Sequence, residues 1–262
     1  MLLLDEVEGD AAGRRSVARA IAWTLLVLLL AIDLMFVACH LFLVGAPEVF
    51  EHAWSVEADT GYAEKFQHLK WLAAVVLLLI LALTRRAAVY LAWAAIFLYF
   101  LVDDATSIHE TQGGRLAVEF GLERVQQIYA AWFPAFYLRP QDFGELAVAL
   151  FAAAAIAFAL ILCWPRNGAV RERLVAKRLV AWLALFAFFA VGFDMLHIMA
   201  MDPVTMFTPA FYWLGVIEDG GEMLCASILV GGLALELTRA SRRSGARSSK
   251  RGRRIEALLP LG

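Results

Sequence analysis

Charged side chains are scarce in this sequence. Asp, Glu, Lys and Arg together make up 18% of the 262 residues, whereas 62% of the residues are hydrophobic and the mean hydropathy is +0.70. A soluble domain is roughly 45–50% apolar, so this composition excludes an ordinary soluble protein. The sequence therefore predicts an integral membrane protein.

Cysteine is also scarce, but this scarcity excludes no class of function. The three cysteines, Cys39, Cys163 and Cys225, all fall in apolar stretches, where a buried cysteine usually behaves as a small hydrophobic side chain. Cys39 and Cys225 lie at the depth of the polar residues described below. A role as soft metal ligands therefore stays open for these two.

Apolar runs of about 20 residues, the length needed to cross a bilayer, can be read six times along the chain. We predict an all-α fold class, namely a polytopic integral membrane protein with a six-helix transmembrane bundle over residues 20–238. The predicted spans are 20–44, 69–84, 87–108, 143–164, 179–201 and 211–238.

The distribution of Arg and Lys predicts the orientation of these helices. Basic residues precede the first span, join the second to the third and the fourth to the fifth, and follow the sixth. Cytoplasmic loops retain positive charge, so we expect both termini in the cytoplasm and the protein in the inner (plasma) membrane. Residues 1–19 then form a cytoplasmic lead-in and residues 239–262 a basic tail against the anionic inner leaflet.

The outer loops under this topology are 45–67, 109–142 and 202–210. The longest of them, 109–142, mixes apolar with charged and amide residues. This mixture is typical of an amphipathic helix that lies on a membrane surface. We expect the outer loops to cover the site described next.

Ionisable residues within or beside the spans gather at one depth. Measured at 1.5 Å per helical residue, they lie about 21 to 31 Å from the basic ends of their helices: Asp33, His40, His68, Asp103, Asp194, His197, Glu218 and Glu222. Within most of these helices they are three, four or seven residues apart and so share one face. An ionisable group in hydrocarbon is costly unless it has a partner. The pattern predicts a functional site in the outer third of the bilayer.

Basic residues are nearly missing at this depth. Eight carboxylates face Lys70 as the one obvious base: Asp33, Asp103, Asp104, Glu110, Asp194, Glu218, Asp219 and Glu222. Such a cluster is neutralised either by protonated carboxyl groups or by bound cations. Mixed carboxylate and imidazole ligands suit Zn, Fe or Mn.

We therefore predict a site for a divalent metal ion. The predicted ligands are Asp33, His40, Asp104, His109, Asp194, His197 and Glu218, and the predicted catalytic residues are Asp103, Glu110 and Glu222. The Asp194-x-x-His197 pair resembles the acidic residue and histidine of di-metal helical bundles, with Asp in place of the usual Glu. His68 lies near a predicted helix start and is interpreted either as an interfacial cap or as a further ligand.

Two functions are compatible with this site. The first is an enzyme that acts on a lipid or lipid-linked substrate by metal-dependent hydrolysis or oxidation. The alternative is a cation or proton carrier, or a membrane sensor, that uses the same cluster. The inner halves of the helices carry almost no polar side chain beyond Thr24 and Ser227, which favours the enzyme. Membrane lipid is the expected partner, and nucleic acid is not.

Overall fold

The computed structural model describes residues 2–45, 52–165, 169–202 and 208–256. Within these ranges the chain is helical and contains no strand. Six helices are long and apolar enough to cross a membrane: Ser16–Phe42, Tyr62–Arg85, Ala88–Thr106, Pro140–Cys163, Val170–Met199 and Pro209–Arg239. The all-α class and the six membrane-length helices predicted from the sequence are confirmed.

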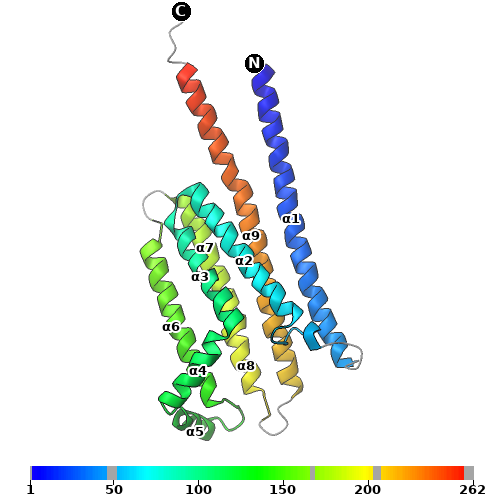
Figure 1. Ribbon diagram of the computed structural model, residues 1–262, viewed down its shortest axis with the longest axis vertical. Helices are drawn as coiled ribbons and strands as arrows, with labels where there is room; N and C mark the ends of the chain where they lie inside the picture. Colours follow the sequence, from blue (N-terminus) through cyan, green and yellow to red (C-terminus); the bar gives the residue numbers. More distant parts are fainter. Residues whose placement is uncertain (1, 46–51, 166–168, 203–207, 257–262) are drawn as a thin grey trace, which may run out of the picture.

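The helices run up and down the long axis of the molecule (Figure 1). In chain order the elements are α1 Leu2–Gly45, η1 His52–Trp54, α2 Tyr62–Arg85, α3 Ala88–Thr106, α4 Ile108–Glu119, α5 Glu123–Trp132, α6 Pro140–Cys163, α7 Val170–Ala187, η2 Phe188–Phe193, α8 Asp194–Met199 and α9 Pro209–Glu256. The element η2 is a π-helix, and it joins α7 to α8 within one membrane-length segment.

Several boundaries differ from those expected from the apolar runs. The second span begins at Tyr62 rather than at residue 69, because a polar first turn continues the helix although it adds no hydropathy. The expected loop 109–142 contains α4, α5 and the start of α6. The sixth helix continues through the basic segment as far as Glu256. Residues 46–51, 203–207 and 257–262 of the predicted loops and tail lie outside the described ranges.

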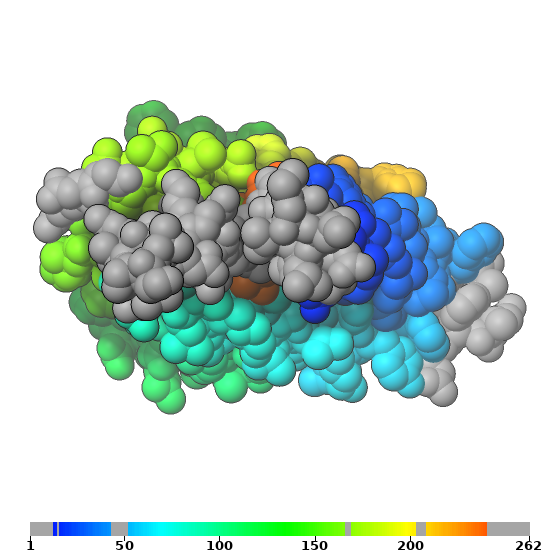
Figure 2. All heavy atoms as spheres, turned by 90° about the horizontal axis from the view of Figure 1, so that it is seen from above, coloured from blue at the N-terminus to red at the C-terminus, as the bar shows by residue number. Residues whose placement is uncertain are grey.

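Helix α9 organises the bundle. It packs against α1, α2, α7, η2 and α8, and its small residues let neighbours approach closely. The ring of Phe189 in η2 lies where a Cβ atom on Gly221 would stand. Figure 2, seen from the end at which α1 begins and α9 ends, places α1 (blue) and the green-to-yellow segments toward opposite sides.

A block of aromatic rings fills the middle of the core. Trp71 of α2 stacks on Phe97 of α3 at 5.8 Å between ring centroids, and Trp182 stacks on Phe186 of α7 at 5.5 Å. The edge of one pair meets the other, with Trp71 and Trp182 5.9 Å apart. Aromatic pairs in these geometries are favourable beyond their buried area, so this block ties α2, α3 and α7 together.

The two ends of the bundle have different chemistry. At the end from which α1 and α9 project, Arg85 and Arg171 both bind Glu236, at 2.9 and 2.8 Å. The opposite end carries α4 and α5 (Figure 1). The cluster of carboxylates described below lies toward that opposite end.

Two glycines allow α4 and α6 to cross in direct contact. A Cβ atom added to Gly144 would collide with the carbonyl oxygen of Gly113. A Cβ atom on Gly113 would in turn lie 2.5 Å from the Glu145 side chain and 2.7 Å from its main-chain nitrogen. Only glycine fits at this crossing, which brings Glu145 of α6 close to the first turns of α4.

Replacing these glycines tests the crossing. Gly113→Ala should force the two backbones apart and lower the stability by about 1–3 kcal/mol, the usual cost of overpacking. The adjacent Gly114→Ala is a matched control, because the nearest atom to its added Cβ is 3.9 Å away. That change should be neutral or stabilising by up to about 1 kcal/mol, since alanine favours helix. Thermal melts in detergent would compare the two, and equal melting temperatures would contradict the close crossing.

Candidate functional site

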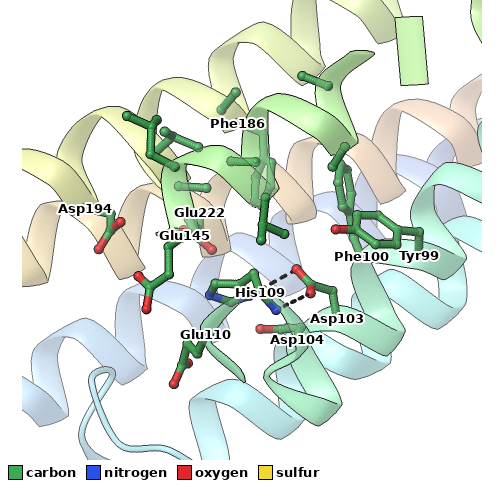
Figure 3. A pocket seen from close by; sticks show the side chains of 18 of the residues that line it. Tyr99, Phe100, Asp103, Asp104, His109, Glu110, Glu145, Phe186, Asp194 and Glu222 are labelled. Carbon is green, nitrogen blue, oxygen red and sulfur yellow. Dashed lines mark hydrogen bonds and ion pairs between the residues drawn. The ribbon is translucent and has the colours of Figure 1, made fainter. Parts of the chain in front are cut away.

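A cavity of about 720 Å³ opens among α3, α4, α6, α7, α8 and α9. Figure 3 shows acidic side chains of α3, α4, α6, α8 and α9, together with His109, around this cavity. Nine carboxylate residues line the cavity: Asp59, Asp103, Asp104, Glu110, Glu145, Asp194, Glu218, Asp219 and Glu222. The only strongly basic residue among its described lining is Arg139.

The charge of Arg139 is neutralised by an ion pair with Asp142, three residues along the chain. Its Nη2 and Nε atoms lie 2.7 and 3.0 Å from the carboxylate of Asp142, which is buried at the start of α6. Hydrogen bonding to Asp142 raises the pKa of the Arg139 guanidinium. The cavity therefore has a large excess of carboxyl groups over basic groups.

Asp103 and His109 form the junction between α3 and α4. Ser107 adopts a left-handed conformation there, with φ 45°, and the chain turns so that α4 begins beside the end of α3. One oxygen of Asp103 accepts the main-chain N–H of His109 at 3.0 Å, and the other lies 3.1 Å from Nδ1 of its ring. This hydrogen bond to Asp103 raises the pKa of the His109 imidazole, and the ring lies at the cavity wall.

Glu64, His68 and Asp104 form a group suited to a metal ion. One ligand atom from each lies within 4.8 Å of the other two; Nε2 of His68 is 3.4 Å from Asp104 Oδ2 and 3.8 Å from Glu64 Oε1. All three residues are half-buried. His68 Nε2 and Asp104 Oδ2 are themselves buried without a hydrogen-bond partner. Because buried polar atoms are normally satisfied, this donor set fits a divalent cation, and Asp104 belongs both to the group and to the cavity wall.

His197 reaches the cavity through its partner. Its Nδ1 atom lies 2.9 Å from Oε2 of Glu218, and Glu218 lines the cavity. The Nε2 atom of His197 is buried without a hydrogen-bond partner. The carboxylate of Glu57 lies over Gly215 next to the same ring, so a second acidic group, from the η1–α2 connection, lies close to this pair.

Asp33 lies apart from the cavity, and its charge is satisfied elsewhere. The Lys70 ammonium donates to Oδ1 of Asp33 at 2.8 Å and to the main-chain carbonyl of Met223 at 2.9 Å. The Ser227 hydroxyl donates to Oδ2 at 2.5 Å. Asp33 and Lys70 are almost completely buried, with 0% and 1% of their surfaces exposed. We therefore assign Asp33 to this ion pair rather than to a metal ion.

His40 also lies outside the cavity lining. Its Nδ1 atom is 2.8 Å from the Ser55 hydroxyl, and its ring stacks on Tyr212 at 5.4 Å. This places His40 against η1 and the start of α9. Cys39 and Cys225 are likewise missing from the cavity lining.

Most of the site residues predicted from the sequence thus gather around one space. The cavity is lined by seven of the ten predicted site residues: Asp103, Asp104, His109, Glu110, Asp194, Glu218 and Glu222. His197 binds one of them, whereas Asp33 and His40 do not line it. Glu64 and Glu145 were not among the residues predicted from the sequence. Glu64 shares a helix face with His68, four residues on, and becomes recognisable once the helix is known to begin at Tyr62.

Comparison with known proteins identifies a family without a known function. Residues 65–236 match the model of a family described as a domain of unknown function, DUF8692, and the chain belongs to that family. No curated protein and no solved structure matches the chain.

The ion pair of Lys70 with Asp33 can be tested by breaking it from either side. Asp33→Asn or Lys70→Met alone should lower the stability by about 3–5 kcal/mol, because each leaves a buried charge without its partner. The double variant Asp33→Asn with Lys70→Met should recover most of that loss, since both charges are removed together. Thermal melts of the four proteins in detergent measure the coupling. Additive losses would show that the two side chains do not act as a pair.

Proposed function

We propose that this member of the DUF8692 family is a metal-dependent membrane enzyme that acts on a lipid or lipid-linked substrate by hydrolysis or oxidation. One observation carries the proposal: the metal-suited group Glu64, His68 and Asp104 shares Asp104 with the wall of a large acidic cavity. A cation held there would face the cavity. The helices around the cavity are long and apolar enough to cross a membrane, so membrane lipids would have direct access to the site.

The donor set favours Zn, Fe or Mn. One imidazole nitrogen, a borderline ligand, and two carboxylate oxygens, which are hard ligands, form a mixed set that these ions accept, whereas Ca and Mg prefer oxygen alone. Three protein ligands are typical of catalytic rather than purely structural zinc sites, since they leave coordination positions for water or substrate. A bound ion of this kind polarises a substrate oxygen or activates a water at neutral pH.

Other cavity residues supply proton transfer. His109 is held by Asp103 with its ring at the cavity wall, so it can donate a proton to a leaving group. Two carboxyl groups that line the same cavity are our candidates for accepting a proton. They are Glu110, which follows His109 on α4, and Glu222 on α9. Asp194 and Glu218 complete the acidic wall and offer further ligands to a cation.

A carrier or sensor built on the same cluster is the alternative. Transport needs polar groups that lead to the opposite face. Beyond the carboxylates, the cavity wall along α6 and α7 consists of apolar residues such as Ala153, Leu160 and Leu183. This lining supports an enzyme reached from one side.

Metal content tests the proposed site directly. Protein purified after growth with Zn, Fe and Mn should carry about one such ion per chain, as expected for one three-residue site, when measured by elemental mass spectrometry. His68→Ala should lose the ion, because its Nε2 atom is central to the group. His52→Ala is a matched control, since His52 is exposed and belongs to η1. Wild-type protein without metal, or an equal metal content in His68→Ala, would contradict the site.

We also propose that both termini lie in the cytoplasm and that the cavity opens toward the outer side. The convergence of Arg85 and Arg171 at the end from which α1 and α9 project supports this orientation, because basic residues are retained inside.

Fusions with a reporter that is active only outside the cytoplasm test the orientation. Fusion after Arg254 should be inactive, and fusion after Gly121, between α4 and α5, should be active. The opposite pattern would invert the topology. Two active or two inactive fusions would show that the chain does not span the membrane as proposed.

A further inference from the structure

The cavity has two chemically distinct parts. Its acidic part, next to α4 and the start of α8, contains the carboxylates and His109 (Figure 3). The remainder extends between α6 and α7 and is lined by small or apolar residues: Ala149, Ala152, Ala153, Ile156, Ala157 and Leu160 on α6, with Val180, Leu183, Phe186 and Ala187 on α7. We call this second part the apolar shaft.

The apolar shaft is long for a binding pocket. Along α6, the shaft runs from Ala149 to Leu160, which is about 16 Å of helix. With the acidic part included, the lining of α6 begins at Glu145 and covers about 22 Å. One leaflet of hydrocarbon is about 15 Å thick, half of a bilayer core. The shaft therefore has room for a long acyl or alkyl chain lying parallel to the helices, with its head group in the acidic part.

The shaft is open toward the lipid side because α6 packs mainly against α4 and α3 and not against α7. α6 packs on α4 and α3, and its crossing with α4 at Gly144 holds one end close. The lining residues of α6 are mostly alanine, and Ala153 and Ala157 remain exposed although they face inward. Small side chains along this helix leave the space beside α7 unfilled, and Figure 1 shows α6 at the edge of the bundle.

The charge of the acidic part limits the head group of any occupant. A carboxyl group supplies no positive charge in either protonation state. The charge of Arg139 is neutralised by Asp142, and the imidazole of His109 is paired with Asp103. The ammonium of Lys70 is taken up by Asp33. Like charges brought together cost several kcal/mol, so a phosphate or carboxylate head is disfavoured, whereas an amine finds many acceptors.

We propose that the substrate of this site is a lipid with one long alkyl or acyl chain and a cationic amine head. The chain lies in the apolar shaft between α6 and α7, and the head lies among Glu110, Glu145 and Asp194. This inference rests on the proposed function, because it assigns the substrate class of the same site.

Binding of lipids with one chain and different heads tests the assignment. Immobilised protein in detergent at fixed micelle concentration would be saturated with radiolabelled hexadecylamine and competed with unlabelled hexadecylamine, hexadecanol, hexadecyl phosphate and butylamine. Hexadecylamine should compete about tenfold or more better than hexadecyl phosphate, which places like charges together. Butylamine should compete at least about tenfold less well, since it buries few methylene groups. Equal or better competition by the phosphate or by butylamine would overturn the proposal.

A bulky residue in the shaft provides the second test. Ala153→Trp should fill the shaft and weaken hexadecylamine binding by about tenfold or more, because the alkyl chain loses its buried surface. Ala154→Trp is the matched control, since Ala154 is exposed on the same helix and does not line the cavity. It should bind within about twofold of wild type. Thermal melts confirm that both variants fold. Unchanged binding in a folded Ala153→Trp protein would also overturn the proposal.

Running the competition with chelator and again with added Zn or Mn separates this proposal from the metal site. If protein that never binds metal still prefers hexadecylamine, the lipid-binding proposal stands and the metal-dependent function is refuted. If metal binds at His68 but hexadecylamine is not preferred, the metal site stands and the lipid-binding proposal is refuted.

Discussion

The buried contact between Lys70 and Asp33 is the interaction on which the rest of the bundle depends. It joins α2 to α1, and the Met223 carbonyl and Ser227 hydroxyl join both to α9. A charged group in hydrocarbon is costly unless paired, so these three helices have one favourable arrangement. α9 then presents Glu218, Asp219 and Glu222 to the opposite side, toward α3, α6 and α8.

This ion pair also determines the chemistry of the cavity. Lys70, the lysine buried in the bundle, forms an ion pair with Asp33, and Arg139 forms one with Asp142. Histidines contact Asp103, Asp104 and Glu218, but no other Lys or Arg of the described residues is left to neutralise the acidic groups around the cavity. Ions or cationic head groups are the natural complement to such a wall, and the buried atoms His68 Nε2 and Asp104 Oδ2, which face each other at 3.4 Å, mark one place for them.

Helix contacts then divide the cavity into its two parts. Gly113 and Gly144 draw α4 onto α6 at the acidic end, which brings Glu145 beside His109 and Glu110 (Figure 3). Farther along α6, alanines replace large side chains, and the space next to α7 stays open. A polar end and an apolar shaft thus result from one close crossing and a run of small residues on the same helix.

The sequence by itself determined the class of the protein and the depth of its polar residues, because hydropathy and a rise of 1.5 Å per residue depend on the chain alone. It could not show which face of one helix meets which face of another. For that reason Asp33 and Asp194 looked alike, although one pairs with Lys70 and the other lines the cavity. It also missed Glu64, because hydropathy locates the apolar part of a helix and not its polar first turn. Only the tertiary structure decided which acids share a space, since that depends on how whole helices pack.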